Sequence, residues 1–275
     1  ASLFTREFYR AAKSRMNAGG IFVQWVQSYE VDPAALRTVI GTLRAEFGHV
    51  GIWQSMIDSD LLLVASDTPV RPHRDLLHAR LQTEPYKSGF ARAWGTEGVE
   101  GLLTGYIAGD RFAKAVLDAQ GDQLNTDDRT LVEFLFARSL GRKIKVHARD
   151  IGLLAARLGA IEAPIDGPWD RAKVSEMLTV RALAEEGPVQ LPRGATGAMA
   201  QRMRARQLYQ NGQMREALRT WRQQPEPGKQ PRDEAMLAHL AAATGDAAAP
   251  ALIDAMAQFQ PVEALVYRAL LADRR

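Results

Sequence analysis

Two adjacent carboxylates, Asp127 and Asp128, are the residues in this 275-residue sequence whose types and spacing most suggest chemistry. Paired carboxylates attract ammonium groups, so this pair is a candidate for holding a cationic amine. Aspartates also hydrogen-bond their own backbone in turns and at helix starts, and the surrounding run Asn125 to Arg129 is polar. The sequence therefore leaves two roles open, of which capping a turn or helix is the simpler.

The histidines and the absence of cysteine limit the other kinds of site. His73 and His78 are five residues apart with no third ligand nearby, which is not the spacing of a zinc site. Without cysteine, disulfides and thiolate ligands are excluded. The remaining histidines are isolated in the sequence, and no nucleophile–base arrangement can be assembled from them. We therefore predict no catalytic residue and no metal ligand; the isolated histidines are His49, His147 and His239.

Arginines gather in one stretch of the chain. Between Arg193 and Arg232 there are nine basic residues and only two acidic ones. Such a local surplus attracts polyanions or an anionic membrane surface, although a solvated helix face is the simpler interpretation. We predict weak, salt-sensitive contact of this kind and no specific nucleic-acid binding, through one face with Arg202 and Arg206 and a second with Arg215, Arg219 and Arg222.

The composition is that of an ordinary soluble globular protein. Apolar residues make up 46% of the chain, charged residues 24%, and the net charge is +3. The longest apolar runs, such as Leu61 to Ala65, are far shorter than the roughly 20 residues that span a bilayer. Helical spacing begins almost at the first residue, at Leu3 and Phe4, and Ala1 to Tyr9 lack the basic and then apolar layout of a signal peptide. We therefore expect a cytoplasmic region that is part of a longer protein.

An α/β pattern occupies the first part of the sequence. Thr5 is a candidate N-cap for a helix that ends at Gly19-Gly20. Ile21 to Val26 is nearly continuously apolar, which predicts a strand covered on both faces, as in a parallel sheet. Asp32-Pro33 then begins a second amphipathic helix, which Gly48 ends.

Two strands follow at hairpin spacing, Val50 to Ile57 and Leu61 to Ser66, with only Asp58-Ser59-Asp60 between them. A further strand is predicted at Leu131 to Phe136. The intervening sequence predicts helices at Asp75 to Gln82, Val99 to Ile107 and Arg111 to Ala119.

Beyond Arg138 the sequence predicts helices only. Two turns, at Asn211-Gly212 and Gly245-Asp246, place their glycines 33 residues apart, which is typical of tetratricopeptide-like repeats. With two copies, the second of them degenerate, an irregular helical bundle remains an alternative. The predicted helices are Ala148 to Leu158, Arg171 to Glu185, Met199 to Gln210, Met214 to Gln223, Arg232 to Ala243, Ala251 to Phe259 and Val262 to Ala272.

Two segments resemble the spermidine synthase (polyamine aminopropyltransferase) superfamily. The first is Leu3 to Tyr9 followed by Gly19 to Trp25, similar to the helix and Gly-Gly turn that lead into the family's fifth strand. The second, Leu124 to Arg129 with Leu131 to Phe134, is similar to a motif of bacterial proteins in which a membrane-spanning region is fused to a spermidine-synthase-like domain. Many of these proteins carry helical repeats at the C-terminus.

The resemblance implies the fold. Residues 1–140 would be the C-terminal half of a Rossmann-like, methyltransferase-type domain, and residues 141–275 a helical region that is tetratricopeptide-like from about Arg193. Gln24 matches a glutamine that borders the family's substrate cleft, although a strand residue with a satisfied amide is equally compatible. The family's polyamine-side tyrosine has no match, because the connection that carries it is only Asp58-Ser59-Asp60 here.

The resemblance also implies a function for the parent protein, namely transfer of an aminopropyl group from decarboxylated S-adenosylmethionine to an amine. The glycine-rich turn, the ribose-binding carboxylate and the catalytic aspartate of the family would all precede Ala1. The chain alone is therefore expected to be inactive and to bind no cofactor. The alternative is a non-catalytic module whose helical repeats bind a protein partner.

Overall fold

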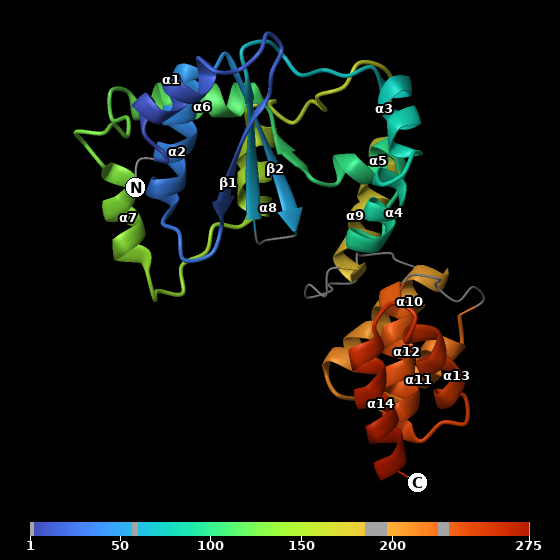
Figure 1. The fold of residues 1–275 in the computed structure, drawn as a ribbon. Coiled ribbons are helices and arrows are strands. Elements are labelled where there is room, and N and C mark those ends of the chain that lie inside the picture. Colours follow the sequence, from blue (N-terminus) through green and yellow to red (C-terminus); the bar gives the residue numbers. More distant parts are fainter. Residues whose placement is uncertain (1–2, 57–59, 185–196, 225–230, 275) are drawn as a thin grey trace. The chain divides into compact units, whose positions relative to one another are not determined.

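The computed structural model describes residues 3–56, 60–184, 197–224 and 231–274, and the chain forms two compact units. The first unit comprises Ala1–Thr83 and Gly98–Val174, and the second comprises Glu84–Glu97 and Ser175–Arg275. Figure 1 shows a small sheet with its helices in the first unit and helices alone in the second. The predicted α/β layout followed by a helical region is therefore confirmed. None of the described helices is both long and apolar enough to cross a lipid bilayer.

The sheet contains four strands in the order β1-β3-β2-β4, and every neighbouring pair is antiparallel. The strands are β1 (Phe22–Gln27), β2 (His49–Met56), β3 (Asp60–Ser66) and β4 (Tyr106–Ala108). Because β1 and β2 both run antiparallel to β3, they run parallel to each other. Helix α2 (Pro33–Glu46) joins them, so β1, α2 and β2 form a crossover with β3 inserted between its two strands.

Helices α1 (Arg6–Lys13), α2, α6 (Asp110–Gln120) and α7 (Leu131–Ser139) share one apolar core with the sheet. Two of them begin where capping residues predict. The Thr5 side chain accepts a hydrogen bond from the Phe8 backbone N–H at 3.3 Å, and Asp32 accepts one from Ala34 at 2.7 Å, with Pro33 following it. Helix α1 ends at Lys13, earlier than the predicted Gly19-Gly20.

The prediction that Ile21 to Val26 forms a strand covered on both faces of a parallel sheet is wrong. Strand β1 lies at one edge of the sheet and pairs only with β3, antiparallel to it. Ile21, Val23 and Trp25 alternate along the strand and are about half exposed, whereas Val26 is buried. A continuous apolar run is compatible with a strand that is exposed on one face and also with a strand that is covered on both faces. Composition alone therefore could not distinguish the two.

Two further element types were predicted incorrectly. The apolar run at Leu131 to Phe136 is part of helix α7 and not a strand: Val132 is buried while Phe134 is exposed, as in a helix with one face on the core. The segment predicted as one helix over Val99 to Ile107 divides into α5 (Gly98–Leu103) and strand β4. The β2–β3 hairpin was predicted correctly, although residues 57–59 of its turn lie outside the described residues.

The first unit extends past residue 140, where sequence reasoning placed its end. Helix α8 (Ala148–Arg157) contributes Ala148, Ile151 and Ala155 to the same core and packs on β4. Helix α3 (Arg74–Leu81) is held to α5 by an ion pair of 3.0 Å between Arg74 and the buried Glu100.

The second unit is helical throughout its described residues. A guanidinium–aromatic contact of 3.5 Å between the buried Arg181 and the ring of Trp94 joins two of its segments. Its helices are α4 (Tyr86–Ala93), α9 (Arg171–Ala184, which begins in the first unit), α10 (Gly197–Gln210), α11 (Met214–Arg222), α12 (Pro231–Thr244), α13 (Ala249–Met256) and α14 (Pro261–Asp273).

The turns α10–α11 and α12–α13 have the same geometry. Gly212 and Gly245 adopt φ angles of 76° and 68°, the left-handed conformation that favours glycine. In each turn the N–H after the glycine donates to a carbonyl five residues back: Gln213 to Leu208 at 2.9 Å, and Asp246 to Ala241 at 2.9 Å. The prediction that each glycine lies in the turn that joins the two helices of a pair is confirmed.

Candidate functional site

Gln24 lies on the edge strand β1 and is half-buried. Its side-chain amide donates a hydrogen bond of 3.0 Å to the backbone carbonyl of Trp25, the next residue in the strand. This contact satisfies part of the amide locally, as expected of a strand residue. No hydrogen bond or ion pair joins Gln24 to Asp127 or Asp128 among the residues that the structure describes.

Asp127 and Asp128 are exposed in a tight turn whose ends, Thr126 and Arg129, bridge each other. The backbone N–H of Asp127 donates to Glu7 of α1 at 3.0 Å, so the turn is fixed beside that helix. Neither aspartate side chain makes an ion pair with a described residue. The pair thus occupies a polar turn, and its two carboxylates face solvent.

The residue of this motif that organises the structure is Asn125, which sequence reasoning did not single out. Asn125 is buried, and its side-chain oxygen accepts from the Val132 backbone N–H at 3.0 Å. Its own N–H donates to Thr42 of α2 at 3.0 Å, and its carbonyl accepts from Arg6 of α1 at 2.8 Å. Asn125 therefore connects α1, α2 and α7. A polar residue directly before a run of charged turn residues is too weak a signal to reveal such a role.

Acid–base and metal chemistry find little support in the described part of the chain. No group of three or more His, Asp or Glu side chains is arranged to hold a metal ion there. His239 accepts or donates a hydrogen bond of 2.7 Å with the Tyr209 hydroxyl and stacks on Tyr267, with ring centroids 4.8 Å apart. Burial lowers the pKa of His239. This cluster lies between helices α10, α12 and α14, so we interpret it as part of their packing.

Of the two arginine faces predicted from spacing, the first is engaged in contacts within the second unit and the second is exposed. Arg206, predicted to be exposed, is buried and pairs with Asp233 of α12 at 2.7 Å. Arg202 donates to the side chain of Gln224 at 2.8 Å. Arg202 and Arg206 are therefore engaged within the unit, and Arg206 is not available to a polyanion. Arg206 is buried because it pairs with Asp233. The position of Asp233 beside α10 depends on how α12 packs, which the spacing of the arginines does not show.

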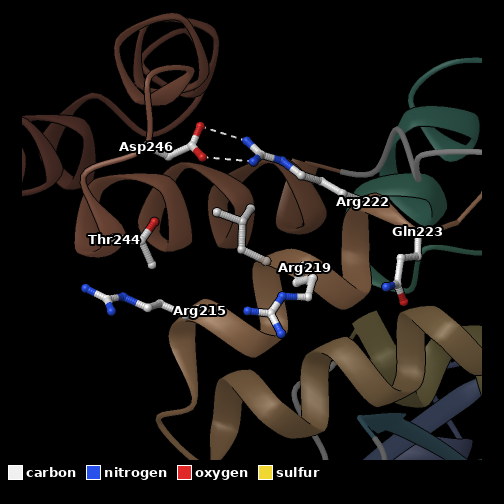
Figure 2. Close-up of a pocket in the computed structure, with 7 residues that line it drawn as sticks. Arg215, Arg219, Arg222, Gln223, Thr244 and Asp246 are labelled. Atoms are coloured by element: carbon white, nitrogen blue, oxygen red, sulfur yellow. Dashed lines mark hydrogen bonds and ion pairs between the residues drawn. The ribbon is translucent and has the colours of Figure 1, made fainter.

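The arginines of α11 line a surface groove instead (Figure 2). Arg215, Arg219 and Arg222 are exposed and lie at i, i+4 and i+7, so they share one face of the helix as predicted. The groove has a volume of about 450 Å³. Its other lining residues are Leu218 and Gln223 from the same segment, and Thr244 and Asp246 from the end of α12 and the turn that follows.

The three arginines of the groove differ in their contacts. Arg222 makes two hydrogen bonds to the Asp246 carboxylate, of 2.7 and 2.8 Å (Figure 2). The hydrogen bonds from Arg222 and from the Ala248 backbone N–H lower the pKa of Asp246. Neither Arg215 nor Arg219 forms a hydrogen bond or ion pair with any residue that the structure describes. The guanidinium groups of Arg215 and Arg219 therefore lie at the groove without a described partner.

Comparison of the chain with protein-family models, with curated proteins and with solved structures found no match.

Proposed function

We propose that the first unit is the C-terminal part of a spermidine-synthase-like domain, whose complete form transfers an aminopropyl group from decarboxylated S-adenosylmethionine to an amine. The observation that supports this proposal is the strand arrangement. Strands β1 and β2 are parallel and joined by a helical crossover, as in doubly wound α/β sheets. Strand β3 enters antiparallel between them, as the final strand of a methyltransferase-type sheet does.

We further propose that this chain is inactive alone. The reaction is a direct displacement, in which the amine attacks the carbon bonded to sulfur, the carbon–sulfur bond breaks and the amine loses a proton. The protein must place the two substrates in line and accept that proton. Among the described residues, no hydrogen bond or ion pair joins Gln24 to Asp127 or Asp128, and the 275 residues contain no glycine-rich strand–helix turn for the nucleotide.

Calorimetric titration with decarboxylated S-adenosylmethionine tests the nucleotide side of the proposal. We expect no binding by this chain, because the backbone approach and the ribose carboxylate that the nucleotide needs are absent from it. A complete spermidine synthase in the same buffer is the positive control. Micromolar binding by this chain would contradict the proposal.

Titration with putrescine and spermidine tests the amine side. If Asp127 and Asp128 hold the cationic amine, binding is lost in the double variant Asp127→Asn/Asp128→Asn. The matched control is Asp122→Asn, which neutralises an exposed aspartate outside the turn. Equal binding by all three proteins would remove the two aspartates from the substrate site and leave them as turn residues.

The alternative function, a non-catalytic interaction module, concerns the second unit. Its support is the groove on α11, where two exposed arginines lack partners among the described residues. The two proposals are compatible, since they assign separate roles to separate units.

A further inference from the structure

Helix α11 presents its arginines from a fixed base. Ala217, Leu218 and Trp221 of the same helix are buried in a core shared with α10 and α12. The ion pair between Arg222 and Asp246 additionally ties the end of α11 to the turn after α12. The backbone positions of Arg215 and Arg219 are therefore set before any ligand arrives, which reduces the entropy lost on binding.

Arg215 and Arg219 have no partner among the described residues, and their spacing indicates which ligand they fit. Residues four apart on a helix have Cβ atoms about 5–6 Å apart. In an extended peptide, side chains two residues apart lie on the same face, separated by about 7 Å. Two carboxylates in the sequence acidic–any–acidic would thus reach Arg215 and Arg219 together, each carboxylate able to accept two hydrogen bonds from one guanidinium.

We propose that the groove formed by α11 and the end of α12 binds an extended acidic segment of a partner protein, with alternate carboxylates on Arg215 and Arg219. This inference does not depend on the aminopropyltransferase proposal, since every residue that it uses belongs to the second unit. It assigns the partner class that sequence reasoning left open.

The charge distribution favours a short acidic segment over a continuous polyanion. The groove lining carries three arginines and one aspartate, and that aspartate, Asp246, lies at the Arg222 end. A chain of phosphates that continued along α11 would meet the Asp246 carboxylate, whereas two carboxylates at Arg215 and Arg219 stop before it. The buried Arg206 on α10 adds no further exposed positive charge that could extend the site.

The small extent of the basic surface favours a peptide over a membrane. An anionic headgroup layer is broad and is recognised by clusters of several basic residues. Here two arginines without described partners border an open groove of about 450 Å³, which suits a few extended residues. The buried side chain of Leu218 forms part of its lining and offers a small apolar contact to the peptide backbone.

The test uses two blocked pentapeptides of identical composition, titrated into the full chain at low salt by calorimetry or fluorescence anisotropy. The first has glutamate at its second and fourth positions and threonine elsewhere, so that both carboxylates share a face when extended. The second has glutamate at its second and third positions. We expect the first to bind about tenfold more tightly, because only it engages both arginines at once.

Variants assign the binding to the groove. Arg215→Ala/Arg219→Ala should bind the first peptide at least about tenfold more weakly, while Arg204→Ala, which removes an exposed arginine of α10 outside the groove, should bind it normally. Circular dichroism checks that each variant is folded. Reversing both charges with Arg215→Glu/Arg219→Glu should transfer binding to a peptide with lysines at the alternate positions, a gain that misfolding could not produce.

The same titrations with a single-stranded oligonucleotide and with phosphatidylserine vesicles separate the other anions. The proposal is overturned if either of them binds through Arg215 and Arg219 while the alternate-glutamate peptide does not. It is equally overturned if the two peptide isomers bind alike, or if Arg204→Ala weakens binding as much as the groove variant.

Discussion

The helix pair α10–α11 and the helix pair α12–α13 turn through the same backbone geometry but present different surfaces. Positions 33 residues apart share their burial: Met203 matches Met236, and Ala205 matches Ala238. On the outer helices the correspondence ends, since Arg215 and Arg219 of α11 are replaced by Ala248 and Leu252 near α13. The backbone framework is thus repeated while the arginines of the groove are not, which confines the proposed anion binding to the first pair.

The largest expected effect is at a position that differs between the pairs, the buried Arg206 in the first and the half-buried His239 in the second. Arg206→Met should lower the free energy of unfolding by about 3–5 kcal/mol, because Asp233 is left buried without its cation. Urea unfolding measures this loss. The double variant Arg206→Met/Asp233→Leu should recover most of it, whereas Arg204→Met at an exposed position should change stability by less than about 0.5 kcal/mol.

If the two helix pairs share one backbone framework, the same substitution in either turn should lower the stability of the protein equally. Gly212→Ala and Gly245→Ala each force a side chain into the left-handed conformation, at a cost of about 1–2 kcal/mol. No atom lies within 4 Å of the added Cβ at either position, so backbone strain is the whole cost. Thermal unfolding of the two variants should agree, and a large difference would mean that the two turns are not equivalent.

A pH dependence should belong to the second pair alone. Burial lowers the pKa of His239, so between its lowered and its ordinary pKa the unfolded chain binds more protons than the folded chain. Stability contributed by the neutral imidazole is complete above about pH 6.5 and declines as the pH falls toward the lowered value. His239→Phe should cost about 1 kcal/mol at pH 8 and remove this decline; urea unfolding at several pH values tests both.

The smallest stability effect is expected where the two pairs meet, at Asp246. Asp246→Asn should lower the free energy of unfolding by only about 0.5 kcal/mol, because its ion pair with Arg222 lies at the surface, where about half of the arginine side chain is exposed. The variant should nevertheless bind the alternate-glutamate peptide about threefold more tightly, since Arg222 is released and one negative charge is gone. Weaker binding would show that Arg222 must be held by Asp246 for the groove to form.

Features that depend on a few neighbouring residues could be predicted from the sequence. The Thr5 cap and the Asp32-Pro33 helix start use side chains within three positions of the groups that they contact. The left-handed turns at Gly212 and Gly245 have the same local origin. The geometry of these contacts is set by residues close in sequence, so their residue types are enough to predict where they occur.

Features that depend on distant segments could not be predicted in this way. Arg206 and Arg219 are both arginines on amphipathic helices, and only the packing of Asp233 against α10 makes one of them buried. The run at Leu131 to Phe136 has the composition of a strand, but its first turn is held by Asn125 and its apolar face packs on the core as a helix. For the candidate site, sequence spacing predicted the shared face of Arg215, Arg219 and Arg222 but not the groove that they line.

The hydrogen bonds of Asn125 have a consequence for the order in which the molecule folds. They close loops of 83 residues to Thr42 and of more than 100 residues to α1, so they form only after most of the first unit has collapsed. The contacts of the helix pairs, such as Arg206 with Asp233, span only 27 residues. Since chains with short-range contacts fold faster, the helix pairs should acquire their structure during synthesis sooner after their residues emerge than the junction of α1, α2 and α7 at Asn125 does.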